Sequence, residues 1–286
     1  MNYYLISTAH LEDRVLFRDD EDFKVAMNAV ALYAALFGIR VLAFILMSNH
    51  MHFVFYGHRI DAEHFINELK RHYSRFFQHK YGIKELLRRN EVDIKLIENV
   101  EEALERVIAY VQMNCVAANI CIHPWAYSWG TGKCFFAESR RNGVLLETLS
   151  QNQRQNLMRS RLPVSGKLVL GEDGYILPES YVDVQGVEAL YKTPKRMNYF
   201  LHSSSKSRRV LEDDSNSPAF KDQTILPAVT DLCYSLFQKR QFSELKTEQQ
   251  AEVLKQLRYR FSANVHQLSR VCGSSYEDVA RLLDSM

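Results

Sequence analysis

Hydrophobic and polar positions alternate along the first part of the chain in two distinct periods. Period-two alternation predicts strands, and apolar residues at three- and four-residue spacing predict helices. The pattern predicts strands over residues 2–10, 39–48, 50–56 and 93–98, and helices over residues 23–37, 62–80 and 101–118. This order predicts an α+β, ferredoxin-like split β-α-β domain, an antiparallel sheet with helices on one face.

Beyond residue 135 the pattern becomes less regular. Residues 136–210 are expected to form a basic extension, residues 211–220 a polar linker and residues 221–286 a mostly helical domain. Residues 265–283 have the pattern of a helix-turn-helix, with Ser274 and Glu277 at capping-box spacing. The second helix of this pair carries more acidic than basic residues, so packing or dimerisation is as good an interpretation as DNA reading.

Composition narrows the class of protein. The net charge is only +2, but residues 135–210 hold 12 basic and 7 acidic side chains, which favours a polyanionic partner. The five cysteines are odd in number and form no Cys-x-x-Cys pair, so a reducing compartment is expected. No signal peptide or membrane-spanning run is evident, and the prediction is a cytoplasmic protein with no membrane partner.

Two histidines stand out in the strand predicted over residues 50–56. His50 and His52 are two residues apart, so a strand would present both imidazoles on one face. Imidazole is a frequent metal ligand, and the pair would supply half of a divalent site. A bare His-x-His pair is also common on the wet side of a sheet, so the pattern alone leaves both interpretations open.

Several blocks together resemble a known family. Residues 42–53 (Leu-Ala-Phe-Ile-Leu-Met-Ser-Asn-His-Met-His-Phe) resemble the histidine block of the single-tyrosine (Y1) HUH transposases. These are IS200/IS605-like enzymes, and the REP-associated tyrosine transposases are the most similar group. Residues 17–20, 69–77, 110–116 and 124–129 fit the same family, so the resemblance covers roughly residues 1–135.

The resemblance implies a dimeric, metal-dependent endonuclease and strand transferase. Such an enzyme acts on single-stranded DNA near hairpins through a 5′-phosphotyrosine intermediate, with Mg²⁺ or Mn²⁺ held by the two histidines. Carried onto this chain, the metal ligands are His50 and His52, and the nucleophile is Tyr73 on the following helix. Lys70, Arg71 and Arg75 would assist attack by the phenol, whose ordinary pKa is near 10.

Two of these assignments compete with simpler alternatives. Tyr73 lies within the apolar stripe of its helix, where a tyrosine is usually part of the core. The third metal ligand is open: Gln78 is the nearest amide, but it lies far round an ideal helix from Tyr73, and a water, Glu68 or His72 could replace it.

Basic residues interleaved with aromatic ones suit contact with single-stranded DNA. The predicted DNA contacts outside the catalytic helix are Arg159, Arg161, Lys195, Arg196, Arg208 and Arg209. The alternative functions are a DNA-binding regulator that keeps the fold but cleaves nothing, and a ferredoxin-like scaffold with a structural zinc.

Overall fold

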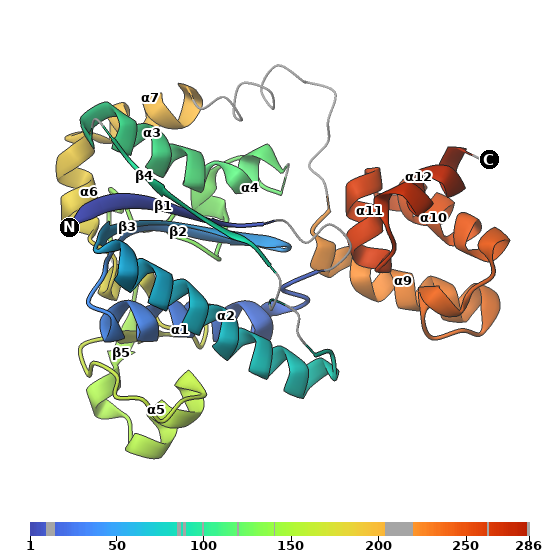
Figure 1. Ribbon diagram of the computed structural model, residues 1–286, viewed down its shortest axis with the longest axis horizontal. Helices are drawn as coiled ribbons and strands as arrows, with labels where there is room; N and C mark the ends of the chain where they lie inside the picture. The colour runs from blue at the N-terminus through green and yellow to red at the C-terminus, as the bar shows by residue number, and fades with distance from the viewer. Residues whose placement is uncertain are drawn as a thin grey trace.

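Four strands form one antiparallel sheet in the N-terminal part of the chain (Figure 1). The computed structural model describes residues 1–9, 15–84, 87, 90–98, 100–118, 120–139, 141–203, 220–261 and 263–284. The sheet order is β2-β3-β1-β4, with bounds β1 (Asn2–Thr8), β2 (Arg40–Met47), β3 (His50–Gly57) and β4 (Val92–Leu96). The predicted α+β class and the strand order of a split β-α-β domain are confirmed.

Helices cover both faces of this sheet. Helices α1 (Asp20–Leu36) and α2 (Arg59–Tyr81) lie on one face, as expected, but α3 (Val100–Gln112) and α4 (Asn114–Ala117) lie on the other (Figure 1). The prediction of helices on one face was therefore incomplete. The physical reason is that β2 and β3 are buried along nearly their whole length, and a strand buried on both sides needs a layer on each.

The residues after the first two helices reverse the chain. Gly38 follows α1 and Gly82 ends α2, both with positive φ, of 61° and 72°. Glycine adopts this left-handed conformation without the steric cost that a Cβ imposes. Only Ser48 and Asn49 separate β2 from β3, and Met47 pairs with His50, so His50 begins its strand directly after the turn.

The segment after α4 packs back onto the sheet and shares its hydrophobic core. It contains η1 (Pro124–Ala126), η2 (Leu146–Thr148), η3 (Pro178–Ser180), α5 (Gln151–Met158), α6 (Val184–Tyr191), α7 (Pro194–Ser203) and a ribbon of β5 (Gly143–Leu145) with β6 (Val169–Gly171). The Tyr127 hydroxyl donates to the Leu46 carbonyl at 2.8 Å, and the Ile176 amide donates to Asn28 Oδ1 at 2.8 Å. These contacts hold the segment against β2 and α1.

The C-terminal region is helical and has a hydrophobic cluster of its own. It comprises α9 (Asp222–Phe237), η4 (Phe242–Glu244), α10 (Thr247–Phe261), α11 (Val265–Cys272) and α12 (Tyr276–Asp284). The predicted helix pair is present, but Ser275 and Asp278, one residue later than predicted, make the capping contacts of α12. The predicted linker lies almost entirely outside the described residues. No described helix is long and apolar enough to span a bilayer.

Candidate active site

The two predicted histidine ligands lie side by side on the sheet face that α3 covers. Strand alternation points Phe53 and Phe55 toward α2, where both rings contact Phe65 at centroid distances of 5.3 and 4.7 Å. His50 and His52 therefore face the other way. Their ring centroids are 4.8 Å apart, and the residues are only 5% and 3% exposed.

Each imidazole is oriented through its Nδ1 atom. His52 Nδ1 lies 2.8 Å from Ser7 Oγ on the neighbouring strand, and His50 Nδ1 lies 2.9 Å from Asn49 Oδ1. An amide oxygen can only accept, so His50 donates from Nδ1 and its Nε2 carries the lone pair that ligation requires. A partner on the second ring nitrogen is the arrangement that orients metal-binding histidines.

A tyrosine on α3 completes this face. The Tyr110 ring lies 5.5 Å from the His52 ring at 69°, and its side chain is half-buried. Both residues line a pocket of about 840 Å³ that also includes Ser7, Asp93 and Lys95. Burial raises the pKa of the Tyr110 phenol, and the positive charge of Lys95 acts in the opposite direction.

Asn114 stands one helical turn beyond Tyr110 on the same side. The segment leading into α3 pairs with the outer end of β1, through Ile97 N to Tyr3 O at 2.9 Å, whereas Tyr110 lies beside His52. Helix α3 thus runs antiparallel to β3, from the Gly57 end toward the His50 end. Asn114 is buried and donates from Nδ2 to the Tyr110 carbonyl at 2.8 Å, which directs its amide along this side of the helix.

The structure does not bring Tyr73 to the histidines. Tyr73 lies on α2, across the sheet from His50 and His52, and is 1% exposed. Its hydroxyl donates to the Leu16 carbonyl at 2.5 Å, and burial raises the pKa of this phenol well above its usual value. A protonated phenol enclosed by its own chain cannot reach a phosphate, so the nucleophile assigned by resemblance does not fit this structure.

The other predicted ligand on α2 is separated from the histidines in the same way. Gln78 is exposed near the end of α2, on the opposite side of the sheet. Among the residues that the structure describes, no three His, Cys, Asp or Glu side chains cluster closely enough to hold a metal ion. The histidine pair would need an amide, water or substrate oxygen as its remaining ligand.

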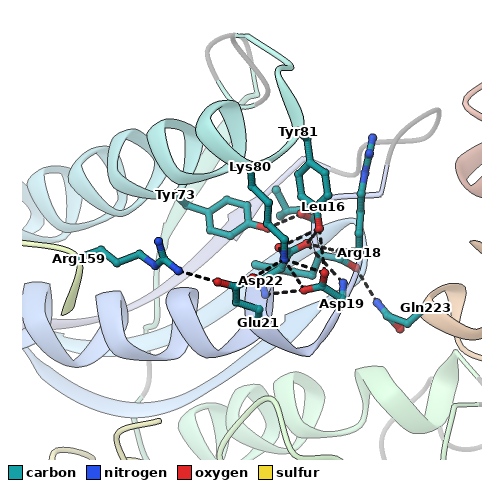
Figure 2. A network of polar contacts seen from close by, with 11 residues as sticks. Leu16, Arg18, Asp19, Glu21, Asp22, Tyr73, Lys80, Tyr81, Arg159 and Gln223 are labelled. Atoms are coloured by element: carbon teal, nitrogen blue, oxygen red, sulfur yellow. Dashed lines mark hydrogen bonds and ion pairs between the residues drawn. The ribbon is translucent and has the colours of Figure 1, made fainter. Parts of the chain in front are cut away.

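Tyr73 instead belongs to a structural network (Figure 2). It contacts the segment Val15–Arg18, which we call the strap. Leu16 N and Phe17 N donate to the Ser48 carbonyl at 2.6 and 3.2 Å, directly before the turn that leads to His50. The network therefore stabilises the start of β3 from the sheet face opposite the histidines.

The acidic start of α1 is tied to the end of α2 in the same view. Lys80 Nζ contacts Asp19 at 2.7 Å and the fully buried Asp22 at 2.9 Å, and the Tyr81 hydroxyl lies within hydrogen-bond distance of both carboxylates, at 3.1 and 3.0 Å (Figure 2). These contacts raise the pKa of Lys80 against the effect of burial. The charges stabilise the helix ends.

The predicted DNA-contacting side chains are spread over several surfaces. On α2, Lys70 donates to the Asn90 carbonyl, Arg71 pairs with Glu68 and Arg75 is exposed. None of these three lines the Tyr110 pocket, which lies across the sheet from α2.

The remaining predicted DNA contacts lie beyond the sheet. Arg159 pairs with Glu21 at 2.6 Å, and Arg196 makes two hydrogen bonds to Glu105, at 2.6 and 2.8 Å. Arg161 and Lys195 are exposed, whereas Arg208 and Arg209 lie outside the described residues.

The sequence pattern did not single out Tyr110 and Asn114, which lie within residues 110–116, one of the blocks that resemble the family. The signal that could have identified them is their spacing of four residues on a helix, which places a phenol and an amide on one side, whereas Tyr73 has Phe77 at that spacing. An amphipathic helix reveals its buried stripe, but not which face of the sheet it covers.

Comparison with known proteins identifies the N-terminal domain. Residues 1–114 match the family model described as "Transposase IS200 like". A solved structure of a REP-associated tyrosine transposase bound to a REP hairpin aligns at 13% identity and a TM-score of 0.37, covering 46% of this chain and 76% of that one. No curated protein matches. Residues 1–114, which hold the histidine pair, Tyr110 and Asn114, are therefore an IS200-like Y1 transposase domain.

Proposed function

We propose that this protein is a metal-dependent single-stranded DNA endonuclease and strand transferase whose nucleophile is Tyr110. One observation carries the proposal: within a transposase domain, a half-buried phenol and His52 line the same pocket of about 840 Å³, and His50 lies next to His52. The pocket is within the size range of ligand sites, and a nucleophile next to metal-ligating side chains is the arrangement that phosphoryl transfer needs.

The chemistry follows from the side chains. The Tyr110 oxygen forms a bond to phosphorus, the bond to the leaving deoxyribose 3′-oxygen breaks, and the phenol proton is lost as the 3′-hydroxyl gains one. The strand end stays attached as a 5′-phosphotyrosine, which conserves the phosphodiester energy and allows rejoining without ATP. Lys95, on the wall of the same pocket, favours the phenolate form.

The donor set fits a divalent metal ion such as Mg²⁺ or Mn²⁺. His50 and His52 would hold it, and we propose the Asn114 side chain as a third ligand in place of Gln78. When bound, such an ion would polarise the scissile phosphate and neutralise its developing charge.

The test is covalent trapping. The protein is incubated with labelled single-stranded hairpin DNA and Mn²⁺, and adducts are resolved on a denaturing gel. We expect an adduct that Tyr110→Phe abolishes and that chelation prevents. Tyr73→Phe, which removes the other candidate hydroxyl, should still form the adduct.

Other outcomes separate the alternatives. An adduct that persists in Tyr110→Phe and disappears in Tyr73→Phe would contradict the assignment. DNA binding without any adduct would identify a regulator that keeps the transposase fold, and one tightly held zinc per chain without DNA binding would identify a structural metal site. Light scattering during size-exclusion chromatography tests the predicted homodimer.

A further inference from the structure

A second pocket lies on the far side of α3 from the Tyr110 site. It has a volume of about 560 Å³, within the range of small-molecule sites. Its walls come from η1, from the loop over residues 132–137 and from one side of α7. The residues that matter for its chemistry are Trp125, Lys133, Phe136, Lys195 and Asn198.

An aromatic platform stands at this pocket. The rings of His123 and Trp125 stack at a centroid distance of 4.2 Å with only 12° between their planes. Trp125 nevertheless remains 50% exposed. An exposed indole held in place by a stacked neighbour is a preformed surface for another flat ring, because little side-chain freedom is lost on binding.

The loop that carries Phe136 is held under backbone strain. Phe136 has a φ of 52°, a backbone conformation that is energetically unfavourable for any residue with a Cβ. Its amide donates to Glu188 Oε1 at 2.6 Å. At Gly132 a Cβ would come within 2.3 Å of the Pro124 carbonyl oxygen, so the loop closely approaches η1. The fold therefore constrains both walls of the pocket.

The pocket is complementary to an anion with an aromatic part. Two lysines, Lys133 and Lys195, are among the described residues that line it, and no acidic residue is. Asn198 adds an amide that can donate and accept. Positive charge beside a stacking platform is the combination that holds single-stranded nucleic acid, where the cations meet phosphates and the aromatic ring meets a base.

We propose that this pocket binds an unpaired nucleotide of single-stranded DNA, with its base stacked on Trp125. The proposal rests on the proposed function, because that function supplies the strand. Helices α3 and α7 contribute to both pockets. Tyr110 and Phe200 line the first pocket, whereas Gln112 and Leu201, two residues and one residue further along the same helices, line the second. A strand cleaved at Tyr110 thus passes close to the second pocket, which would bind a base near the cleavage point.

The experiment measures affinity in the Tyr110→Phe background, where no cleavage occurs. The probes are a fluorescein-labelled DNA hairpin with a single-stranded extension and the same hairpin with abasic sites in that extension. We expect the first probe to bind more tightly and to quench tryptophan fluorescence. Trp125→Ala should weaken its binding by about 5- to 150-fold, the range for loss of one stacked base, at constant salt.

Two variants control for other effects. Trp125→Phe keeps a flat ring and should retain most of the affinity. Tyr234→Ala removes an aromatic side chain of similar exposure, 57%, from α9 and should change nothing. Thermal unfolding confirms that each variant is folded.

The outcomes distinguish this inference from the proposed function. If Trp125→Ala binds both probes as tightly as its parent, the nucleotide pocket is refuted, even where native Tyr110 still forms its adduct. If the extension binds through Trp125 but native protein forms no adduct, the pocket stands and the nuclease proposal fails. A change of oligomeric state in Trp125→Ala with unchanged DNA affinity would assign the surface to a second copy of the chain and overturn the proposal.

Discussion

Replacing Tyr73 with phenylalanine tests whether this tyrosine is structural. The substitution removes one hydroxyl and keeps the ring, which packs against Phe17 and Phe76 at centroid distances of 5.0 and 5.8 Å. The hydroxyl donates to the Leu16 carbonyl at 2.5 Å inside the protein. The change therefore removes a hydrogen bond while leaving the apolar packing in place.

The expected cost follows from the buried acceptor. A buried carbonyl that loses its hydrogen-bond donor, where water cannot take the donor's place, lowers the free energy of unfolding by about 1–3 kcal/mol. For a chain of this size the melting temperature should fall by roughly 2–4 °C for each kcal/mol. Because Leu16 and Phe17 also hold the Ser48 carbonyl, a slight weakening of metal binding at the histidines is expected as well.

Urea unfolding followed by far-ultraviolet circular dichroism measures the stability change. Tyr191→Phe is the matched control, since Tyr191 is also fully buried and donates to a backbone carbonyl, that of Glu105, at 2.6 Å. Both variants should lose comparable stability and keep adduct formation. A Tyr73→Phe protein with unchanged stability and no adduct would refute the reasoning and return the nucleophile to α2.

Three further predictions concern the surroundings of the site. Ser7→Ala removes the partner of the His52 ring, so Mn²⁺ affinity measured by calorimetry should fall by about 10- to 100-fold with the fold intact; unchanged affinity would contradict the orienting role. Burial lowers the pKa of His72 to about 4. As the pH falls below the ordinary histidine pKa, His72 is therefore protonated in the unfolded chain before it is protonated in the folded one. Stability should decline between about pH 6.5 and 4 by up to roughly 3 kcal/mol, and His72→Gln should flatten this decline in urea titrations; an equal slope in both proteins would show that other groups cause it. Gln223→Ala removes a 2.7 Å hydrogen bond from α9 to the strap and should speed proteolytic release of the C-terminal helices, whereas unchanged digestion would show that apolar packing alone holds them.

Local periodicity determined most of the architecture of the N-terminal domain. The alternation through residues 50–56 placed His50 and His52 on one face, and the structure confirms it, because side-chain direction in a strand depends only on the neighbouring backbone. The turn at Ser48-Asn49 and the ends of the first two helices were equally local. The continuous apolar runs of β2 and β3 also carried a signal that both sheet faces are covered.

Only the tertiary structure decided which tyrosine meets the histidines. Tyr73 and Tyr110 both lie on amphipathic helices. Helical periodicity shows whether each side chain lies on the apolar face of its helix, but not against which surface that face packs. That choice depends on how α2 and α3 pack on opposite faces of the sheet, a contact between segments distant in the chain. The same layering placed Gln78 away from the histidines and Asn114 beside Tyr110, because a side chain can reach a metal only from the face to which its helix is bound.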